Sequence, residues 1–138
     1  MPQTDTDTLC EAFDLAPHPA SAAEARHRAL AWLCQHSVDQ QAAEAAVLVV
    51  SELVTNALVH SRSDVIRCAL RLGGGLLRIE VTDQGADLPE PAVRAPDVDE
   101  TSGRGLLLVS MVCEAWGVSV AVPGGRTVWA TLRTAEPG

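Results

Sequence analysis

The stretch Val47–Ser63 constrains the fold most, because its pattern predicts one long helix with two different faces. Apolar residues fall at spacings of three and four, and they form a stripe that must be buried. Glu52, Asn56 and His60 follow one another at intervals of four, in a polar column close to that stripe. The stripe consists of Val47, Val50, Leu53, Val54, Ala57 and Leu58.

The polar column has two interpretations. A solvated helix face is the ordinary one, and it is favoured for an isolated E-x-x-x-N because short matches often arise by chance. In the chemical interpretation, Asn56 supplies a neutral oxygen to a hard cation and Glu52 is a base one turn away. Mg²⁺ prefers oxygen ligands and keeps several waters, so one amide together with substrate phosphates is a sufficient set.

Length and charge limit the classes of protein. A chain of 138 residues suits one compact domain with a core, and a formal net charge of −8 argues against non-specific nucleic-acid binding. Every basic residue is arginine, which excludes a P-loop lysine or a lysine Schiff base. Metal, arginine or backbone N–H groups must therefore neutralise any bound polyphosphate.

The cysteines and the N-terminus indicate a compartment. The cysteines are widely spaced without a C-x-x-C pair, so a zinc site is not expected and the thiols are interpreted as buried groups in a reducing compartment. No apolar signal region begins the chain, and no apolar run reaches membrane-spanning length. We expect a cytoplasmic protein that contacts no membrane. These cysteines are Cys10, Cys34, Cys68 and Cys113.

The first half of the chain predicts a strand and two helices. Residues Leu9–Leu15 alternate as an edge strand with Phe13 pointing inward. Ser21 is a suitable N-cap with Glu24 at the capping-box position, and its helix runs to about Gln35. The expected apolar anchors of that helix are Ala25, Leu30, Trp32 and Leu33. Ser37 or Asp39 begins the helix that contains the opening stretch.

Two hairpins are predicted in the second half. Asp64–Leu72 and the alternating residues from Leu77 onward flank a glycine turn, and Trp116–Val122 and Arg126–Arg133 flank another. Between the hairpins, Asp83–Ser102 lacks periodicity over about twenty residues, and loops of that length are usually functional. A helix over Leu106–Ala115 follows this loop.

This order of elements predicts the fold class α/β (α+β), as a two-layer sandwich. Strands arrive as hairpins, so the sheet is expected to be mixed but mostly antiparallel, with the helices on one face. We expect a single domain over residues 9–133, between a flexible tail at 1–8 and a second tail at 134–138.

Three further motifs can carry chemistry. Asp83 ends a strand and can accept a hydrogen bond from an exocyclic amine, while Gly85 would let a flat ring approach the backbone, although Asp and Gly are also common in turns. The segment Ser102-Gly103-Arg104-Gly105 precedes a helix, where backbone N–H groups favour an anion, although it also fits a tight turn. Thr127 could bond a base or a bridging water, or could simply be a good strand residue.

The motifs taken together are more specific than any one of them. Their order is E-L-V-T-N-A, then D-Q-G after a strand, then S-G-R-G-L-L-L-V, then G-G-R-T-V-W-A. This series resembles the nucleotide-binding domain of the GHKL ATPase/kinase superfamily, whose Bergerat fold matches the predicted sandwich. The short loop and the last two motifs look most like anti-sigma-factor serine/threonine kinases and their actinobacterial ATP-binding relatives. The resemblance covers roughly Phe13 to Leu132.

The resemblance implies a role for each matching residue. Asn56 would hold Mg²⁺ across the phosphates of ATP, and Glu52 would orient or deprotonate the attacking hydroxyl. Asp83 would bind the adenine amine beside Gly85, and Thr127 would support that contact. The phosphate loop would close through Gly103, Arg104 and Gly105. The family often has D-x-G-x-G, and this chain has Asp87 at the second glycine position, which puts nucleotide affinity or the lid in doubt.

The resemblance also implies a function and partners. It indicates a kinase that phosphorylates an anti-sigma-factor antagonist and sequesters a sigma factor, acting as a homodimer without nucleic acid. The retained Glu52 favours this activity, whereas Asp87 leaves open a non-catalytic module in which ATP only sets the conformation for partner binding. A histidine kinase core is disfavoured, because no dimerisation and phosphoacceptor helices precede the domain.

Overall fold

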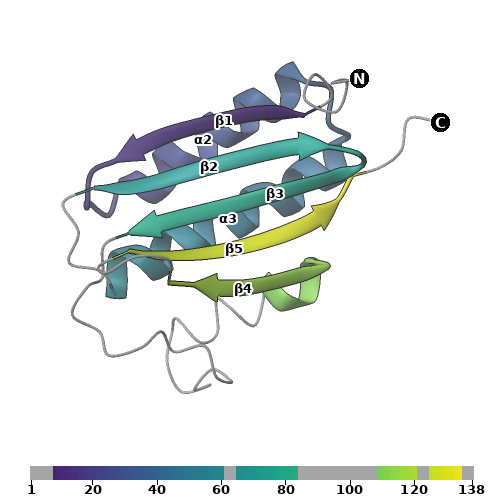
Figure 1. Ribbon diagram of the computed structural model, residues 1–138. Coiled ribbons are helices and arrows are strands. Elements are labelled where there is room, and N and C mark those ends of the chain that lie inside the picture. Colours follow the sequence, from purple (N-terminus) through teal and green to yellow (C-terminus); the bar gives the residue numbers. More distant parts are fainter. Residues whose placement is uncertain (1–7, 61–64, 84–108, 121–124, 135–138) are drawn as a thin grey trace.

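The computed structural model describes residues 8–60, 65–83, 109–120 and 125–134. Its described strands form one five-stranded sheet, and the helices α2 and α3 lie together on one face of it (Figure 1). The predicted two-layer α+β sandwich is therefore confirmed. The elements in chain order are β1 (Leu9–Leu15), α2 (Ser21–Gln35), α3 (Gln40–His60), β2 (Ile66–Gly73), β3 (Leu76–Asp83), β4 (Ala115–Ser119) and β5 (Arg126–Arg133).

The sheet has the strand order β1-β2-β3-β5-β4, and each of these neighbouring pairs is antiparallel. The expectation of a mostly antiparallel sheet with β1 at an edge is thus confirmed. Strands β2 and β3 form the first predicted hairpin, with Gly73 paired to Leu76 across a two-residue turn. Gly74 and Gly75 both have positive φ, of 62° and 77°, as a type I′ turn requires.

The core lies between the sheet and α3, and the period of each element explains why. Alternate residues of the central strands point toward the helices and are buried, as are Arg126, Val128, Ala130 and Leu132 in β5. Helix α3 packs against β2, β3 and β5. Its central apolar residues are fully buried and meet the inward side chains of those strands; they are Val49, Val50, Leu53 and Val54.

Helix α3 also bears on the question of a membrane. By length and composition alone, Gln40–Val59 is long and apolar enough to cross a bilayer, which was not predicted from the sequence. The core helix of a globular fold passes the same test. Because α3 lies along the sheet with its central residues buried, we assign its hydrophobicity to the core of this fold.

The helix starts differ partly from the predictions. Ser21 is not an N-cap: it lies inside α2, and its buried hydroxyl donates to the Ala16 carbonyl at 2.6 Å. Leu30 is not a core anchor, because it is 41% exposed on the outer side of α2. Asp39 is confirmed as the start of the next helix, since its Oδ2 accepts the backbone N–H groups of Gln41 and Ala42.

The second hairpin is confirmed with shorter elements than predicted. Residues 109–112 are helical, and the rest of the predicted helix before them lies outside the described residues. The helix cannot reach Ala115, because the Glu114 N–H already donates to the Thr131 carbonyl of β5 at 2.8 Å. Strand β4 ends at Ser119, short of the predicted end at Val122, which lies outside the described residues.

The cysteines divide into two groups. Cys68 is buried and Cys113 is partly buried, but Cys10 and Cys34 are exposed, so the expectation of four buried thiols is wrong for two of them. Burial raises the pKa of the Cys68 thiol to about 12 and that of Cys113 to about 11. Those two thiols therefore stay protonated and unreactive at neutral pH.

Trp129 and Gly117 form a close contact on the sheet face that α2 and α3 leave open. The two residues are paired across β4 and β5. A methyl group built on Gly117 would lie 2.8 Å from the Trp129 ring, and the Arg78 guanidinium lies 4.5 Å from the centre of that ring. Because Gly117 has no side chain, the Trp129 indole can pack directly against the backbone of β4.

We expect Gly117→Ala to lower the free energy of unfolding by about 1–2 kcal/mol. Overpacking costs about 1–3 kcal/mol, and the better strand propensity of alanine offsets about 0.5–1 kcal/mol of this. Urea denaturation measures the effect. Ser119→Ala, an exposed change on the same strand and face, is the matched control. A Gly117→Ala protein as stable as the parent would show that the indole moves freely.

Candidate functional site

The polar column of α3 is divided between the interior and the surface. Asn56 is only 8% exposed, and Glu52, one turn earlier, is partly exposed. A solvated helix face would leave Asn56 in water, so that interpretation does not hold for this residue. His60 ends α3, and its side chain lies outside the described part of the structure. The helix therefore offers a buried amide next to an accessible carboxylate.

Asp83 lies at the last position of β3, with its side chain 1% exposed on the face toward the helices. The strand register pairs it with Arg126, the first residue of β5. The Nη2 of Arg126 donates to the Oδ2 of Asp83 at 3.2 Å, and Arg126 is itself 9% exposed. A carboxylate buried to this extent needs a partner of opposite charge, and Arg126 supplies it.

The elements that carry these residues come together at one end of the sandwich. The C-terminal end of α3, the end of β3 and the start of β5 lie together at the same end of the sheet (Figure 1). Asp83 and Arg126 therefore lie at this end, and Asn56 and Glu52 lie one and two turns before the end of α3. The other predicted site residues, Gly85, Gly103, Arg104 and Gly105, and also Asp87, lie outside the described residues.

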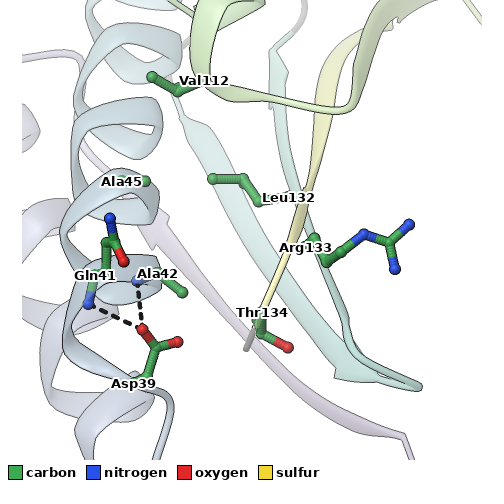
Figure 2. Close-up of a pocket in the computed structure, with 8 residues that line it drawn as sticks. All are labelled: Asp39, Gln41, Ala42, Ala45, Val112, Leu132, Arg133 and Thr134. Atoms are coloured by element: carbon green, nitrogen blue, oxygen red, sulfur yellow. Dashed lines mark hydrogen bonds between the residues drawn. The ribbon is translucent and has the colours of Figure 1, made fainter. Parts of the chain in front are cut away.

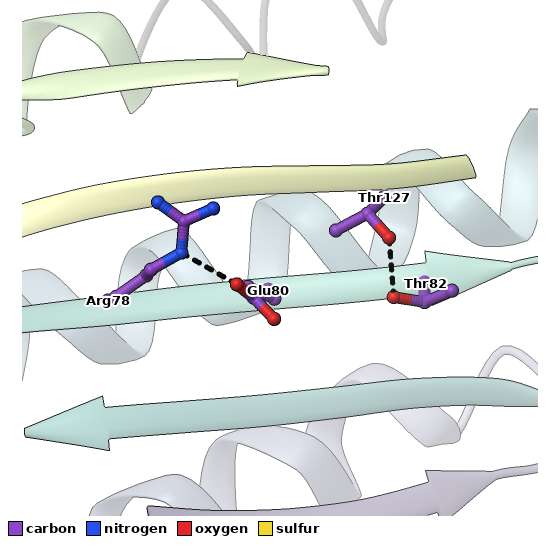
Figure 3. A network of polar contacts seen from close by, with 4 residues as sticks. All are labelled: Arg78, Glu80, Thr82 and Thr127. Atoms are coloured by element: carbon purple, nitrogen blue, oxygen red, sulfur yellow. Dashed lines mark hydrogen bonds and ion pairs between the residues drawn. The ribbon is translucent and has the colours of Figure 1, made fainter. Parts of the chain in front are cut away.

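Thr127 lies on the other side of the sheet. Its hydroxyl oxygen is 2.8 Å from that of Thr82, and Figure 3 shows the two side chains on the face opposite the helices. Arg78 and Glu80 form an ion pair of 2.6 Å along the same face. In β5 it is Arg126, not Thr127, that contacts Asp83. The adenine role of Thr127 stays a prediction.

A comparison with known families decides what kind of domain carries this site. Residues 15–132, most of the chain, match the family model of the histidine kinase-like ATPase domain. The chain belongs to the histidine kinase-like ATPase family. The GHKL resemblance is thereby confirmed, and an ATPase domain implies ATP binding.

Solved structures of two other proteins share the fold of this ATPase domain. The RsbU and RsbW domains of a Mycobacterium tuberculosis protein give a TM-score of 0.69 at 21% identity, over 94% of this chain and 33% of that chain. The SiaB–SiaC complex of Pseudomonas aeruginosa gives a TM-score of 0.68 at 14% identity, over 94% of this chain and 92% of that chain. This chain spans about a third of the mycobacterial chain. A search of curated proteins finds no match.

The oxygen donors of this ATPase domain fit Mg²⁺, the cation that the GHKL resemblance implies. Among the described residues, no three His, Cys, Asp or Glu side chains gather as a metal cluster. Asn56 instead offers one buried amide oxygen, beside the Glu52 carboxylate. A cation that keeps several waters and takes its other ligands from phosphates needs few protein donors, and Mg²⁺ is of that kind.

A separate cavity lies at the opposite end of α3. It has a volume of about 400 Å³, between the first turns of the helix and the end of β5 (Figure 2). None of the predicted site residues that the structure describes lines it. Its lining residues are Asp39, Gln41, Ala42, Ala45, Val112, Leu132, Arg133 and Thr134. This cavity was not predicted from the sequence, because its walls come from elements that become neighbours only in the fold.

Proposed function

We propose that this ATPase-family domain is an anti-sigma-factor-type serine/threonine kinase. It transfers the terminal phosphoryl group of ATP to a serine or threonine of an anti-sigma-factor antagonist, and it binds a sigma factor when that antagonist is unavailable. The observation that carries the proposal is the accessible carboxylate of Glu52, one turn from the buried amide of Asn56. Both lie in the last two turns or so of α3, and that end of the helix is at the sheet end where Asp83 is buried.

Each residue has one task in this reaction. The substrate hydroxyl oxygen attacks the terminal phosphorus, the bond to the bridging oxygen breaks, and ADP leaves. Glu52 orients the hydroxyl and accepts its proton. Asn56 would hold a Mg²⁺, which would supply positive charge to the phosphates; this need is greater because the chain has no lysine. Asp83 holds the adenine amine.

The comparisons support the partner class in general terms. One structural neighbour was solved as a complex of SiaB with SiaC, so this fold is compatible with a protein partner. A homodimer in the cytoplasm, with its single domain over residues 9–133, completes the proposal. The alternative, a module in which ATP only switches partner binding, is favoured by one observation, the acidic Asp87 at a position where the family often has glycine.

Two measurements on the purified protein test the proposal. Calorimetry should show that ATP and ADP bind more tightly with Mg²⁺ than without it, because Asn56 acts through the metal. Incubation with labelled ATP and candidate antagonist domains should label a serine or threonine. Equal affinity with and without Mg²⁺ would reject the role of Asn56. Binding of ATP and of a sigma factor without phosphorylation of any antagonist would support the switch module.

A further inference from the structure

The Nε–H of Arg126 is a buried donor that the fold does not satisfy. Among the described residues, it is the buried side-chain polar atom that has no hydrogen-bond partner. Leaving a buried donor unpaired costs free energy, so such groups are rare in folded proteins and usually mark a ligand or a water. The side chain of Arg126 is nine-tenths buried, so bulk water does not solvate this donor.

The position of this donor is fixed by Asp83. The guanidinium is planar and holds its N–H groups in a rigid fork, so the bond from Nη2 to Asp83 also sets where Nε–H points. Both residues sit on the helix-facing side of the sheet, at the paired ends of β3 and β5. The fold thus places a carboxylate acceptor and an N–H donor next to each other.

An acceptor beside a donor is the pattern that recognises adenine. Asparagine and glutamine read adenine because their oxygen accepts from the amine while their N–H group donates to a neighbouring ring nitrogen. The Asp83 carboxylate and the Arg126 Nε–H offer the same two functions on two side chains. Guanine carries a carbonyl where adenine has its amine, so this carboxylate disfavours it.

We propose that Arg126 is a base-recognition residue, which donates its Nε–H to the ring nitrogen beside the adenine amine while Asp83 accepts from the amine. The inference rests on the proposed adenine role of Asp83 and adds the second half of the contact. In this arrangement the Asp83–Arg126 ion pair selects adenine, in addition to neutralising a buried carboxylate.

Nucleotide analogues that lack one ring nitrogen test this contact. The affinities of ATP, 1-deaza-ATP and 7-deaza-ATP are measured by calorimetry for the parent and for Arg126→Lys. The parent should bind one of the two deaza analogues about tenfold more weakly than ATP, the effect of one lost hydrogen bond in a buried site. Lysine keeps the charge beside Asp83 but lacks the rigid fork, so Arg126→Lys should bind ATP about as weakly as that analogue.

The comparison across ligands separates recognition from structure. In the proposed arrangement Arg126→Lys no longer distinguishes ATP from that analogue. A role confined to holding Asp83 predicts instead that the variant loses the same factor for all three ligands, which would overturn the inference. A donor satisfied by trapped water predicts that the parent binds all three ligands alike, which also overturns it.

A second variant and the parent itself complete the test. If Arg126→Lys does not fold, the double variant Asp83→Asn/Arg126→Met, which removes both charges, should bind ATP weakly and without preference over either analogue; a retained preference overturns the inference. If the parent binds no adenine nucleotide, the proposed function fails and the inference fails with it. If it binds ATP and both analogues equally, the inference alone fails.

Discussion

Glu52→Gln is expected to bind Mg-ATP like the parent and to lose phosphoryl transfer by roughly a hundredfold or more, the range for a removed general base. The substitution keeps the size and the hydrogen-bonding capacity of the side chain and removes only its charge. Glu52 is partly exposed, one turn from the buried Asn56, so it can face an incoming hydroxyl without being needed to hold the nucleotide. Nucleotide affinity and phosphate incorporation into an antagonist are measured on the same preparation.

The same helix provides a matched control. Glu44 lies two turns before Glu52, is exposed, and accepts a hydrogen bond from Gln40 at 3.1 Å. Glu44→Gln removes the same charge from the same helix, so it should leave both affinity and transfer unchanged. Transfer at the parent rate in Glu52→Gln would show that Glu52 is not the base. Equal losses in the two variants would indicate a general effect of helix charge.

The fold could be predicted from the sequence wherever one element carries its own periodicity. The alternation in β2, β3 and β5 indicated buried and exposed faces correctly, and the glycines at 74 and 75 indicated the first turn. The errors lie where a distant contact overrides a local signal. The Ser21 hydroxyl donates to the Ala16 carbonyl instead of capping α2. The Glu114 N–H donates to the Thr131 carbonyl of β5 instead of extending a helix.

The candidate site was predictable only in part for the same reason. Asn56 and Glu52 follow from the spacing within one helix, and Asp83 from the end of one strand. Arg126 was missed, because its partner lies 43 positions away and the pairing of β3 with β5 is not set by any local turn. The alternation of β5 would have placed Arg126 on the buried face, but only the register of the sheet shows what it meets.

Asp83→Asn is expected to lower the free energy of unfolding by about 3 kcal/mol, as when one partner of a buried ion pair is removed. The asparagine can still accept a hydrogen bond, but the buried guanidinium of Arg126 loses its counter-charge. Asp14→Asn is the matched control, because Asp14 pairs with Arg67 at 3.1 Å on the exposed face. An exposed pair contributes at most about 1 kcal/mol, so this control should stay near the parent in urea denaturation.

The double variant Asp83→Asn/Arg126→Met separates the two roles of Asp83. Removing both charges leaves no uncompensated ion, so most of the lost stability should return. Adenine affinity should not return, because the carboxylate that accepts from the amine is still absent; a loss of about 1–3 kcal/mol is the usual effect of a poorly matched buried partner. Calorimetry below the urea transition measures this on folded protein. If the double variant regained both stability and ATP affinity, Asp83 would be a structural residue, and the adenine amine would have to be bound elsewhere in the domain.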